Sequence, residues 1–189
     1  MTETVEWLED MEMALAQAKT KNLPILLFFH NPGWIGCQQM DAGTYPDEKV
    51  IEFTGNNLVP LLIAFDAKPH AADFNIKWTP TLIILGMDGK EHHRTVGFLE
   101  PEAFIANQIL GIGKYHFDND RFPEALTHFE KIMAVFPNSD TIPEAIFLQG
   151  VARYKKSGDP KPLKDAYEKL TADFPDNEWT KRAYPYRLL

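Results

Sequence analysis

The residue with the clearest chemical potential is Cys37, the single cysteine of the 189-residue chain. An apolar run, Ile25 to Phe29, precedes it and is short enough to be a buried strand. The run stops at Asn31-Pro32-Gly33, which is typical of a turn, and a helix is expected to begin at Trp34-Ile35-Gly36-Cys37. Because the free amides at a helix N-terminus stabilise an anion or a thiolate, this junction could carry thiol chemistry.

These residues resemble the thioredoxin-like superfamily, in particular its short, thioredoxin-7 type branch. In that branch a strand ends in Phe, and a Cys-x-x-Cys-Lys-x-Met motif follows three or four residues later. Placed without gaps, Cys37 and Met40 match the second Cys and the Met of the motif. Trp34 then occupies the position of the first, attacking Cys. The motif therefore reads W-x-x-C, a degenerate form of C-x-x-C.

A second motif, Thr79-Pro80-Thr81, supports the resemblance. In thioredoxin-like proteins a T-P-T sequence carries a cis-proline that faces the active-site loop and leaves the backbone of the preceding residue free for an extended partner. The resemblance therefore implies a cis bond before Pro80. It also implies that Gly97 matches the small residue bordering the partner groove.

Cys37 has two interpretations at this stage. A dithiol oxidoreductase needs one sulfur to attack and another to resolve the mixed disulfide, and this chain has only one. In relatives the second Cys is the more buried, and Phe28 occupies the position of their buried, proton-handling Asp. A buried thiol has a raised pKa and is inert, which favours a structural role. The alternative is a monothiol role, such as redox sensing, through Cys37 alone.

Trp34 also has two interpretations. It could be an exposed aromatic anchor that binds a partner in the groove, as aromatic residues do at binding hot spots. It could instead fold back and fill the vacated redox site. Under the first interpretation, the partner-binding residues form one set at the two motifs and the groove border: Trp34, Ile35, Gly36, Thr79, Pro80 and Gly97.

The first 110 residues read as an α/β thioredoxin fold, a mixed central sheet flanked by helices. Helices are expected at 4–20, from Trp34, at 47–56, around 71–74 and from Pro101 onward. Strands are expected at 25–29, 58–65, 82–85 and 92–96. The helix between the first two strands predicts a parallel crossover, and Met87 to Lys90 predicts a hairpin turn. His92-His93-Arg94 is expected at a solvated strand edge.

Residues 111–189 read as an all-α region with internal repetition. Gly111-x-x-x-Tyr115 recurs as Gly150-x-x-x-Tyr154, and Phe136-Pro137-Asn138 recurs as Phe174-Pro175-Asp176. A two-helix unit of this length that ends in Pro is typical of tetratricopeptide (TPR) repeats. Two TPR-like repeats are predicted, at about 109–138 and 144–176, with a capping helix after them. Because two repeats rarely bury a core alone, they are expected to pack on the first domain or to pair two copies of the chain.

The charge is unevenly distributed along the chain. Residues 1–110 hold 7 Lys and Arg against 15 Asp and Glu, whereas residues 111–189 hold 12 of each. This shift supports a domain boundary near residue 110, giving domains 1–110 and 111–189. The net charge of −8 argues against nucleic acid as a partner. No apolar run is long enough to cross a bilayer, and the acidic N-terminus does not resemble a signal peptide, so a cytoplasmic location is expected.

The sequence therefore favours a non-catalytic adaptor that binds a protein or peptide through the thioredoxin groove and the TPR-like surface. The alternative is a thiol–disulfide oxidoreductase relative, involved in cell redox homeostasis, that acts through the single thiol of Cys37. The histidines have no metal-ligand spacing with Cys37, so no metal is expected. No cofactor is expected either, because phosphate-binding loops, nucleophile elbows and paired acid/base carboxylates do not occur in the sequence.

Overall fold

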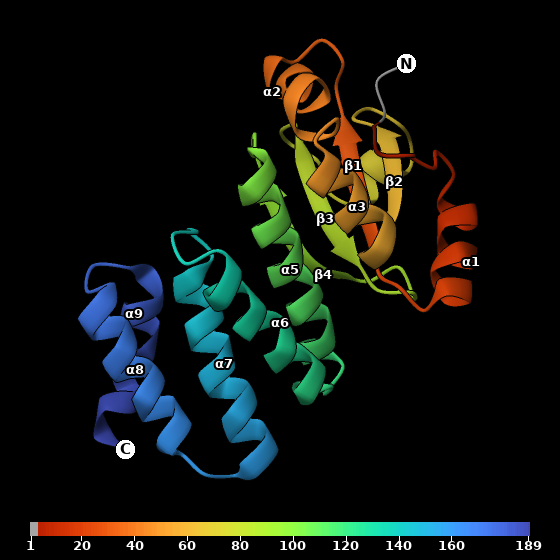
Figure 1. The fold of residues 1–189 in the computed structure, drawn as a ribbon. Coiled ribbons are helices and arrows are strands. Elements are labelled where there is room, and N and C mark those ends of the chain that lie inside the picture. The colour runs from red at the N-terminus through yellow and green to blue at the C-terminus, as the bar shows by residue number, and fades with distance from the viewer. Residues whose placement is uncertain (1–3) are drawn as a thin grey trace. The chain divides into compact units, whose positions relative to one another are not determined.

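The computed structural model describes residues 4–189. The chain divides into two compact units, Met1–Gly111 and Ile112–Leu189. The first is an α/β unit built on a four-stranded sheet, and the second is helical (Figure 1). No helix within residues 4–189 is both long and apolar enough to span a bilayer.

The sheet of the first unit is mixed, with strand order β2-β1-β3-β4. Strand β1 (Ile25–His30) pairs in parallel with β2 (Val59–Ala64), as the predicted crossover requires. On its other side β1 pairs antiparallel with β3 (Thr81–Leu85), which forms a hairpin with β4 (Glu91–Val96). The predicted mixed sheet flanked by helices is confirmed.

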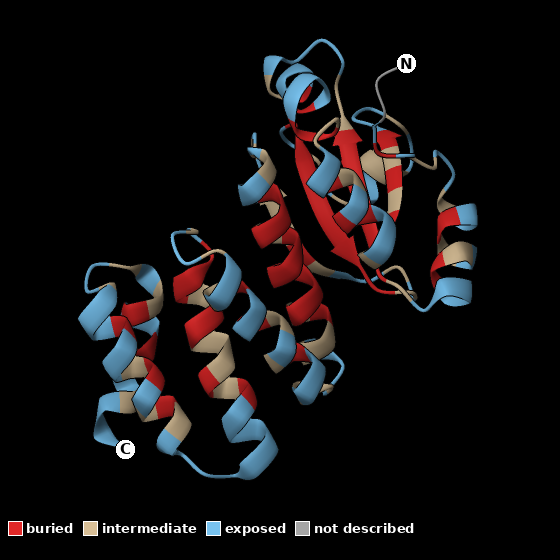
Figure 2. Ribbon diagram, in the orientation of Figure 1, coloured by how far each residue is buried: buried red, intermediate tan, exposed pale blue. Residues whose placement is uncertain are grey.

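The two central strands are buried on both faces, which explains why β1 and β3 read as continuous apolar runs (Figure 2). Successive residues of β1 point to opposite faces of the sheet and pack in different layers. Phe29 packs with Ala14 and Ala18 of helix α1 (Met11–Lys21) in one core cluster. Phe28 points into an aromatic cluster with Trp7 and Tyr45. A polar side chain at residue 28 or 29 would therefore face a packed interior.

The N-terminal segment differs from the predicted helix 4–20, because α1 begins only at Met11. Asp10 caps the helix, its carboxylate accepting a hydrogen bond from the Met13 amide at 2.8 Å. Before the cap, the Leu8 amide donates to the Pro60 carbonyl and the Leu8 carbonyl accepts from the Leu62 amide. This segment therefore pairs with the edge of β2, a contact distant in sequence that satisfies backbone groups a helix would have used locally.

Four further segments connect the strands of this unit. Helix α2 (Ile35–Gln39) runs into the π-helical turn η1 (Met40–Thr44), and α3 (Glu48–Asn57) follows. The predicted cap of α3 is confirmed, because the Asp47 carboxylate accepts from the Lys49 and Val50 amides. Helix α4 (His70–Asp73) is a single turn before β3.

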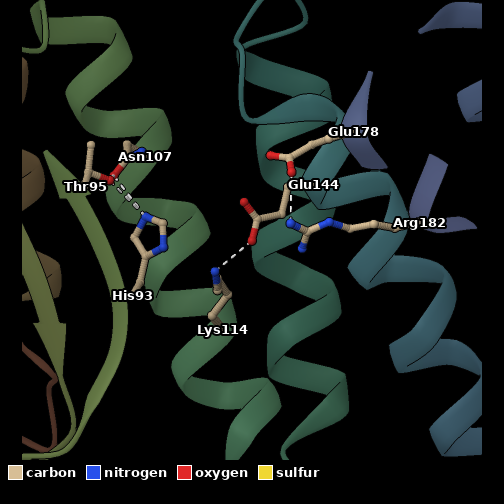
Figure 3. Close-up of polar contacts among 7 residues, drawn as sticks. All are labelled: His93, Thr95, Asn107, Lys114, Glu144, Glu178 and Arg182. Carbon is tan, nitrogen blue, oxygen red and sulfur yellow. Dashed lines mark hydrogen bonds and ion pairs between the residues drawn. The ribbon is translucent and has the colours of Figure 1, made fainter. Parts of the chain in front are cut away.

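Helix α5 (Pro101–Asp118) begins in the first unit and ends in the second. A Cβ on Gly111 would lie 2.6 Å from Ile84 Cγ1 and 2.9 Å from His93 Cδ2, so glycine allows the close approach of this helix to the sheet. His93 is 9% exposed and its Nε2 lies 3.1 Å from Asn107 Oδ1, which also accepts from Thr95 (Figure 3). The expectation of a solvated edge is therefore wrong for His93.

The second unit continues from the end of α5 with four helices and a final turn. They are α6 (Phe122–Val135), α7 (Ile142–Ser157), α8 (Lys161–Asp173), α9 (Glu178–Ala183) and the 3-10 turn η2 (Tyr184–Leu188). The ion pair between Lys114 Nζ and Glu144 Oε1, 2.7 Å apart, joins α5 to α7 (Figure 3). The helical character of the C-terminal region is confirmed.

Two glycines of this unit face a following helix at matching positions. A Cβ on Gly113 would lie 2.6 Å from the Phe129 ring, and one on Gly150 would lie 2.6 Å from Ala166 Cβ. Gly150 thus makes the same kind of contact as Gly113, whereas Gly111 faces the sheet. Gly113, rather than Gly111, therefore makes the contact that resembles that of Gly150.

Candidate functional site

The loop between β1 and α2 is held by its own hydrogen bonds. The Trp34 amide donates to the Asn31 carbonyl at 3.0 Å, and the Gly33 amide donates to Asn31 Oδ1 at 3.0 Å. Gln38 Nε2 reaches back to the Pro32 carbonyl at 2.9 Å. These bonds fix Trp34 as the residue that precedes the first turn of α2.

Cys37 lies inside that turn and is fully buried. The Asn31 amide donates to its Sγ at 3.4 Å. Burial raises the pKa of the Cys37 thiol, and the charge of Asp41 raises it further, whereas the Asn31 amide and the Thr79 side chain act in the opposite direction. Burial is the largest of these effects, and it disfavours the charged thiolate form of Cys37.

Trp34 lies at the surface, with 37% of its side chain exposed. Its ring contacts that of Trp78 edge to face, with centroids 4.9 Å apart and planes at 78°. Trp78 is 56% exposed. The exposed part of the indole is available to a partner, as the first interpretation of Trp34 requires.

The two motifs predicted to meet are in contact. The Thr79–Pro80 bond is cis, as the resemblance implied. A Cβ on Gly36 would lie 2.8 Å from Pro80 Cδ, so the first turn of α2 approaches the proline closely. The Gly97 amide donates to the Pro80 carbonyl at 2.9 Å, which brings the third predicted element to the same place.

A cavity of about 390 Å³ opens beside this contact, and we call it the tryptophan groove. Its lining comes from the ends of β1 and β2, the start of α2 and the segment before β3: Asn31, Trp34, Phe65, Asp66, Ile76, Lys77, Trp78 and Thr79. Of the predicted partner-binding residues, Trp34 and Thr79 line it. Ile35, 60% exposed on the first turn of α2, does not.

Sequence reasoning missed Phe65, Asp66 and Trp78 as lining residues. The sequence did carry a signal for their position, because the carboxyl ends of parallel strands meet at one edge of a sheet. Phe65 and Asp66 follow β2 as Asn31 follows β1, and Trp78 directly precedes the T-P-T motif. A larger cavity of about 800 Å³, lined by the N-terminal segment, α1 and α3, contains none of the predicted residues.

His30 and Asp41 form a polar pair near Cys37, with His30 Nε2 2.8 Å from Asp41 Oδ2. His30 closes β1 and Asp41 lies in η1, so the pair connects the strand to the turn after α2. Within residues 4–189, no group of three or more His, Cys, Asp or Glu side chains is arranged to hold a metal ion.

Comparison with known proteins identifies one conserved type of domain. The family model of a thioredoxin-like domain matches residues 11–107, just over half of the chain. The thiol:disulfide interchange protein DsbD of Pseudoalteromonas atlantica (strain T6c / ATCC BAA-1087) is 25% identical over 114 residues. That match covers 56% of this chain and 19% of the relative, so the chain spans about a fifth of the relative's length.

One solved structure supports the fold. A putative disulphide-isomerase from Bacteroides thetaiotaomicron is similar with a TM-score of 0.53 and 16% identity, over 59% of this chain and 96% of that one. A thioredoxin from Thermus thermophilus has a TM-score of 0.48 and 22% identity, over 55% and 83% of the two chains. At 16% identity, the likeness to the putative disulphide-isomerase describes the fold alone.

Proposed function

Because the chain belongs to the thioredoxin-like domain family, we propose that it keeps the family's partner groove but acts as a non-catalytic adaptor. In this proposal the tryptophan groove and its border at Pro80 and Gly97 hold a segment of a protein or peptide partner. No disulfide is exchanged in the process. The helical unit supplies a second surface for protein binding.

The observation that carries the proposal is the pair Trp34 and Cys37. Dithiol exchange needs an attacking thiolate and a resolving thiol. Here an indole stands where the attacking sulfur belongs, and the remaining sulfur is fully buried with a raised pKa. Neither residue supplies a nucleophile at neutral pH, so the chemistry is lost while the exposed aromatic surface remains.

The backbone beside the groove supports binding of an extended segment. Among residues 4–189, the amide and carbonyl of Thr79 have no hydrogen-bond partner. Free backbone groups next to the end of a strand can pair with a bound extended segment, and neighbouring pockets then select its side chains. The exposed indoles of Trp34 and Trp78 would provide such a pocket.

The second part of the proposal is that the helical unit contains two TPR-like repeats. Its support is the matching contact of Gly113 and Gly150 with the helix that follows each, together with the Phe-Pro pair after α6 and after α8. TPR arrays bind peptides or helices on one face. Pairing of two copies through this unit also belongs to the proposal, as does a cytoplasmic location. The net charge of −8 favours protein over nucleic acid as partner.

The alternative function is monothiol redox chemistry at Cys37. The similarity to a thiol:disulfide interchange protein favours it. Under this alternative, a partner protein or glutathione would supply the second sulfur, and Cys37 would react quickly with a thiol reagent in the folded chain. Under the adaptor proposal, Cys37 labels slowly until the chain is unfolded, and the protein does not reduce insulin disulfides.

The deciding experiment compares two variants in partner capture followed by a binding assay with the purified partner. Trp34→Ala should lose binding, because it removes the exposed indole of the groove. Cys37→Ala should keep binding, and a reductant should not release the partner, since no mixed disulfide is involved. Loss of binding in Cys37→Ala, or release by dithiothreitol, would support the redox alternative instead.

A further inference from the structure

The tryptophan groove has an unusual wall, because two indoles meet at nearly a right angle. Trp34 and Trp78 pack edge to face with planes at 78°, which makes a corner of two aromatic surfaces. Phe65, 39% exposed, lines the same cavity. Three exposed aromatic rings around one cavity are unfavourable in water, so a ligand group that covers them gains binding energy.

The groove also contains a carboxylate. Asp66 follows β2, is exposed, and forms no ion pair with any residue between 4 and 189. The first unit as a whole is acidic, since residues 1–110 carry a net charge of −8. Aromatic faces next to a carboxylate attract a cation, because the ring quadrupole and the full charge act in the same direction.

We propose that the tryptophan groove receives an Arg or Lys side chain from an extended segment of the partner, its charge beside Asp66 and its stem against Trp34 and Trp78. This inference rests on the adaptor function proposed above and names the partner's chemistry. The free backbone of Thr79 would pair with the segment next to the basic residue. An Arg side chain suits both the aromatic rings and the carboxylate, because its guanidinium stacks on aromatic rings and forms hydrogen bonds to carboxylates.

Lys77 is the basic residue of the lining, and its positive charge would favour an anionic ligand group. It is exposed, and its ammonium sits at the end of a flexible stem that can turn to solvent. Asp66 lines the same cavity, and its side chain is shorter than that of Lys77. The exposed rings of Trp34, Trp78 and Phe65 attract cations rather than anions, and they therefore favour a cationic ligand group.

The test is a selection of random nonapeptides, displayed on phage, against the full-length chain. We expect the selected peptides to share one Arg or Lys position and to be lost on Trp78→Ala. For a selected peptide, replacing that Arg by the neutral isostere citrulline should weaken binding about tenfold, as expected when a desolvated cation–π contact is lost. Selection of apolar or acidic peptides would overturn the inference and leave the adaptor function standing. If Trp34→Ala retained the same peptides as the wild type, both would fail.

Charge variants keep the test independent of the folding of the tryptophan variants. Asp66→Asn should weaken the basic peptide about threefold to tenfold, and added salt should reduce the difference. Glu52→Gln, which removes an exposed acid on α3 outside the cavity, is the matched control and should leave affinity unchanged. Lys77→Ala should bind at least as tightly as the wild type. A loss of affinity in Lys77→Ala, with none in Asp66→Asn, would mean that an acidic group is bound and would overturn the inference.

Discussion

Trp34 is an indole at the position that the resemblance assigns to the attacking sulfur, and this limits what the first turn of α2 can do. The position still precedes three free helix amides, which favour negative charge. The indole of Trp34 is not stabilised by these amides, because it has no group that becomes negatively charged at ordinary pH. Cys37, one turn later, is enclosed and lies near the negative charge of Asp41. The positive end of the helix dipole therefore has no thiolate to stabilise at residue 34.

Restoring the sulfur should restore the chemistry, which gives a direct test of this account. In Trp34→Cys, the new thiol lies at the helix N-terminus, and we expect its pKa to fall below the usual value near 8.5. Residues 34 and 37 are one turn apart, within the range that a disulfide spans. The variant should form an intramolecular disulfide on mild oxidation and should reduce insulin in the presence of dithiothreitol.

The control for this variant is Ile35→Cys, one residue along the exposed side of the same turn. It adds a thiol without placing it at the family position, so it should form no disulfide with the buried Cys37. Absence of a disulfide in Trp34→Cys, measured by mass spectrometry after alkylation, would mean that the gap-free placement of the motif is wrong.

Between elements, close helix contacts depend on single glycines. A Cβ on Gly150 would lie 2.6 Å from Ala166 Cβ and 2.9 Å from the Pro162 carbonyl, so α7 and α8 would have to separate. We expect Gly150→Ala to lower the free energy of unfolding by about 1–3 kcal/mol, because overpacking outweighs the better helix propensity of Ala. Urea denaturation followed by the fluorescence of Trp179, in the same unit, measures this change.

Two further variants separate overpacking from other effects. Gly55→Ala makes the same change in α3, where no atom lies within 4 Å of the added Cβ, and should not destabilise the protein. Adding Ala166→Gly to Gly150→Ala removes one of the two clashing atoms and should recover part of the loss. If the effects of the two substitutions on the free energy of unfolding were simply additive, the contact between residues 150 and 166 would not be the cause of the destabilisation.

The contact between α5 and α6 should make the helical unit sensitive to acid. Burial lowers the pKa of His116 to about 4, and the positive charges of His128 and Arg121 act in the same direction, whereas Glu124 opposes them. His116 Nδ1 is buried without a hydrogen-bond partner among residues 4–189. The unfolded chain, with a His pKa near 6.5, binds the proton more readily, so stability falls as pH drops below about 6.5.

We expect the opening free energy of α5 and α6 to fall by about 2 kcal/mol between pH 7 and pH 5 from this group. Amide hydrogen exchange in the two helices, recorded at both pH values, measures it. His116→Phe keeps an aromatic ring and removes the titration, so its protection should change less over the same range. Equal losses in the variant and the wild type would assign the sensitivity to other groups.

The elements that sequence predicted best are those fixed by local chemistry. The cap at Asp47, the buried run of β1 and the hairpin before β4 need only neighbours in the chain. The errors come from contacts distant in sequence. Leu8 leaves a helical pattern because β2 offers backbone partners, and His93 is buried because α5 covers it.

The candidate site shows the same division. The WIGC and T-P-T motifs identified where the site lies, because each is a short local pattern. Phe65, Asp66 and Trp78 belong to different segments, and only the folded sheet brings them into the tryptophan groove. Their types alone carry no signal, since exposed aromatic residues are common. Their positions after β2 and before the T-P-T motif did carry a signal, because the carboxyl ends of parallel strands meet at one edge of a sheet.

For the whole molecule, the position of α5 decides how the two units can be separated. The helix is continuous from Pro101 to Asp118, whereas the boundary between the units falls after Gly111. Its first turns belong to the core of the first unit, since Phe104 packs on Tyr45 and Asn107 bonds His93. A cut after Leu110 would end the chain inside the helix and remove Gly111, which lies against Ile84.

All residues of the tryptophan groove lie in the first unit, so a chain that ends at Asp118 should bind like the full-length protein. We expect its affinity for a selected basic peptide to stay within about threefold, as for independent sites, and its three remaining indole NMR signals to keep their positions. A chain that ends at Leu110 should melt at lower temperature, because a cut helix loses its last hydrogen-bonded turns. If the Asp118 chain kept those signals but lost the peptide, the helical unit would have to contribute to the same binding event, and the assignment of the groove to the first unit alone would be wrong.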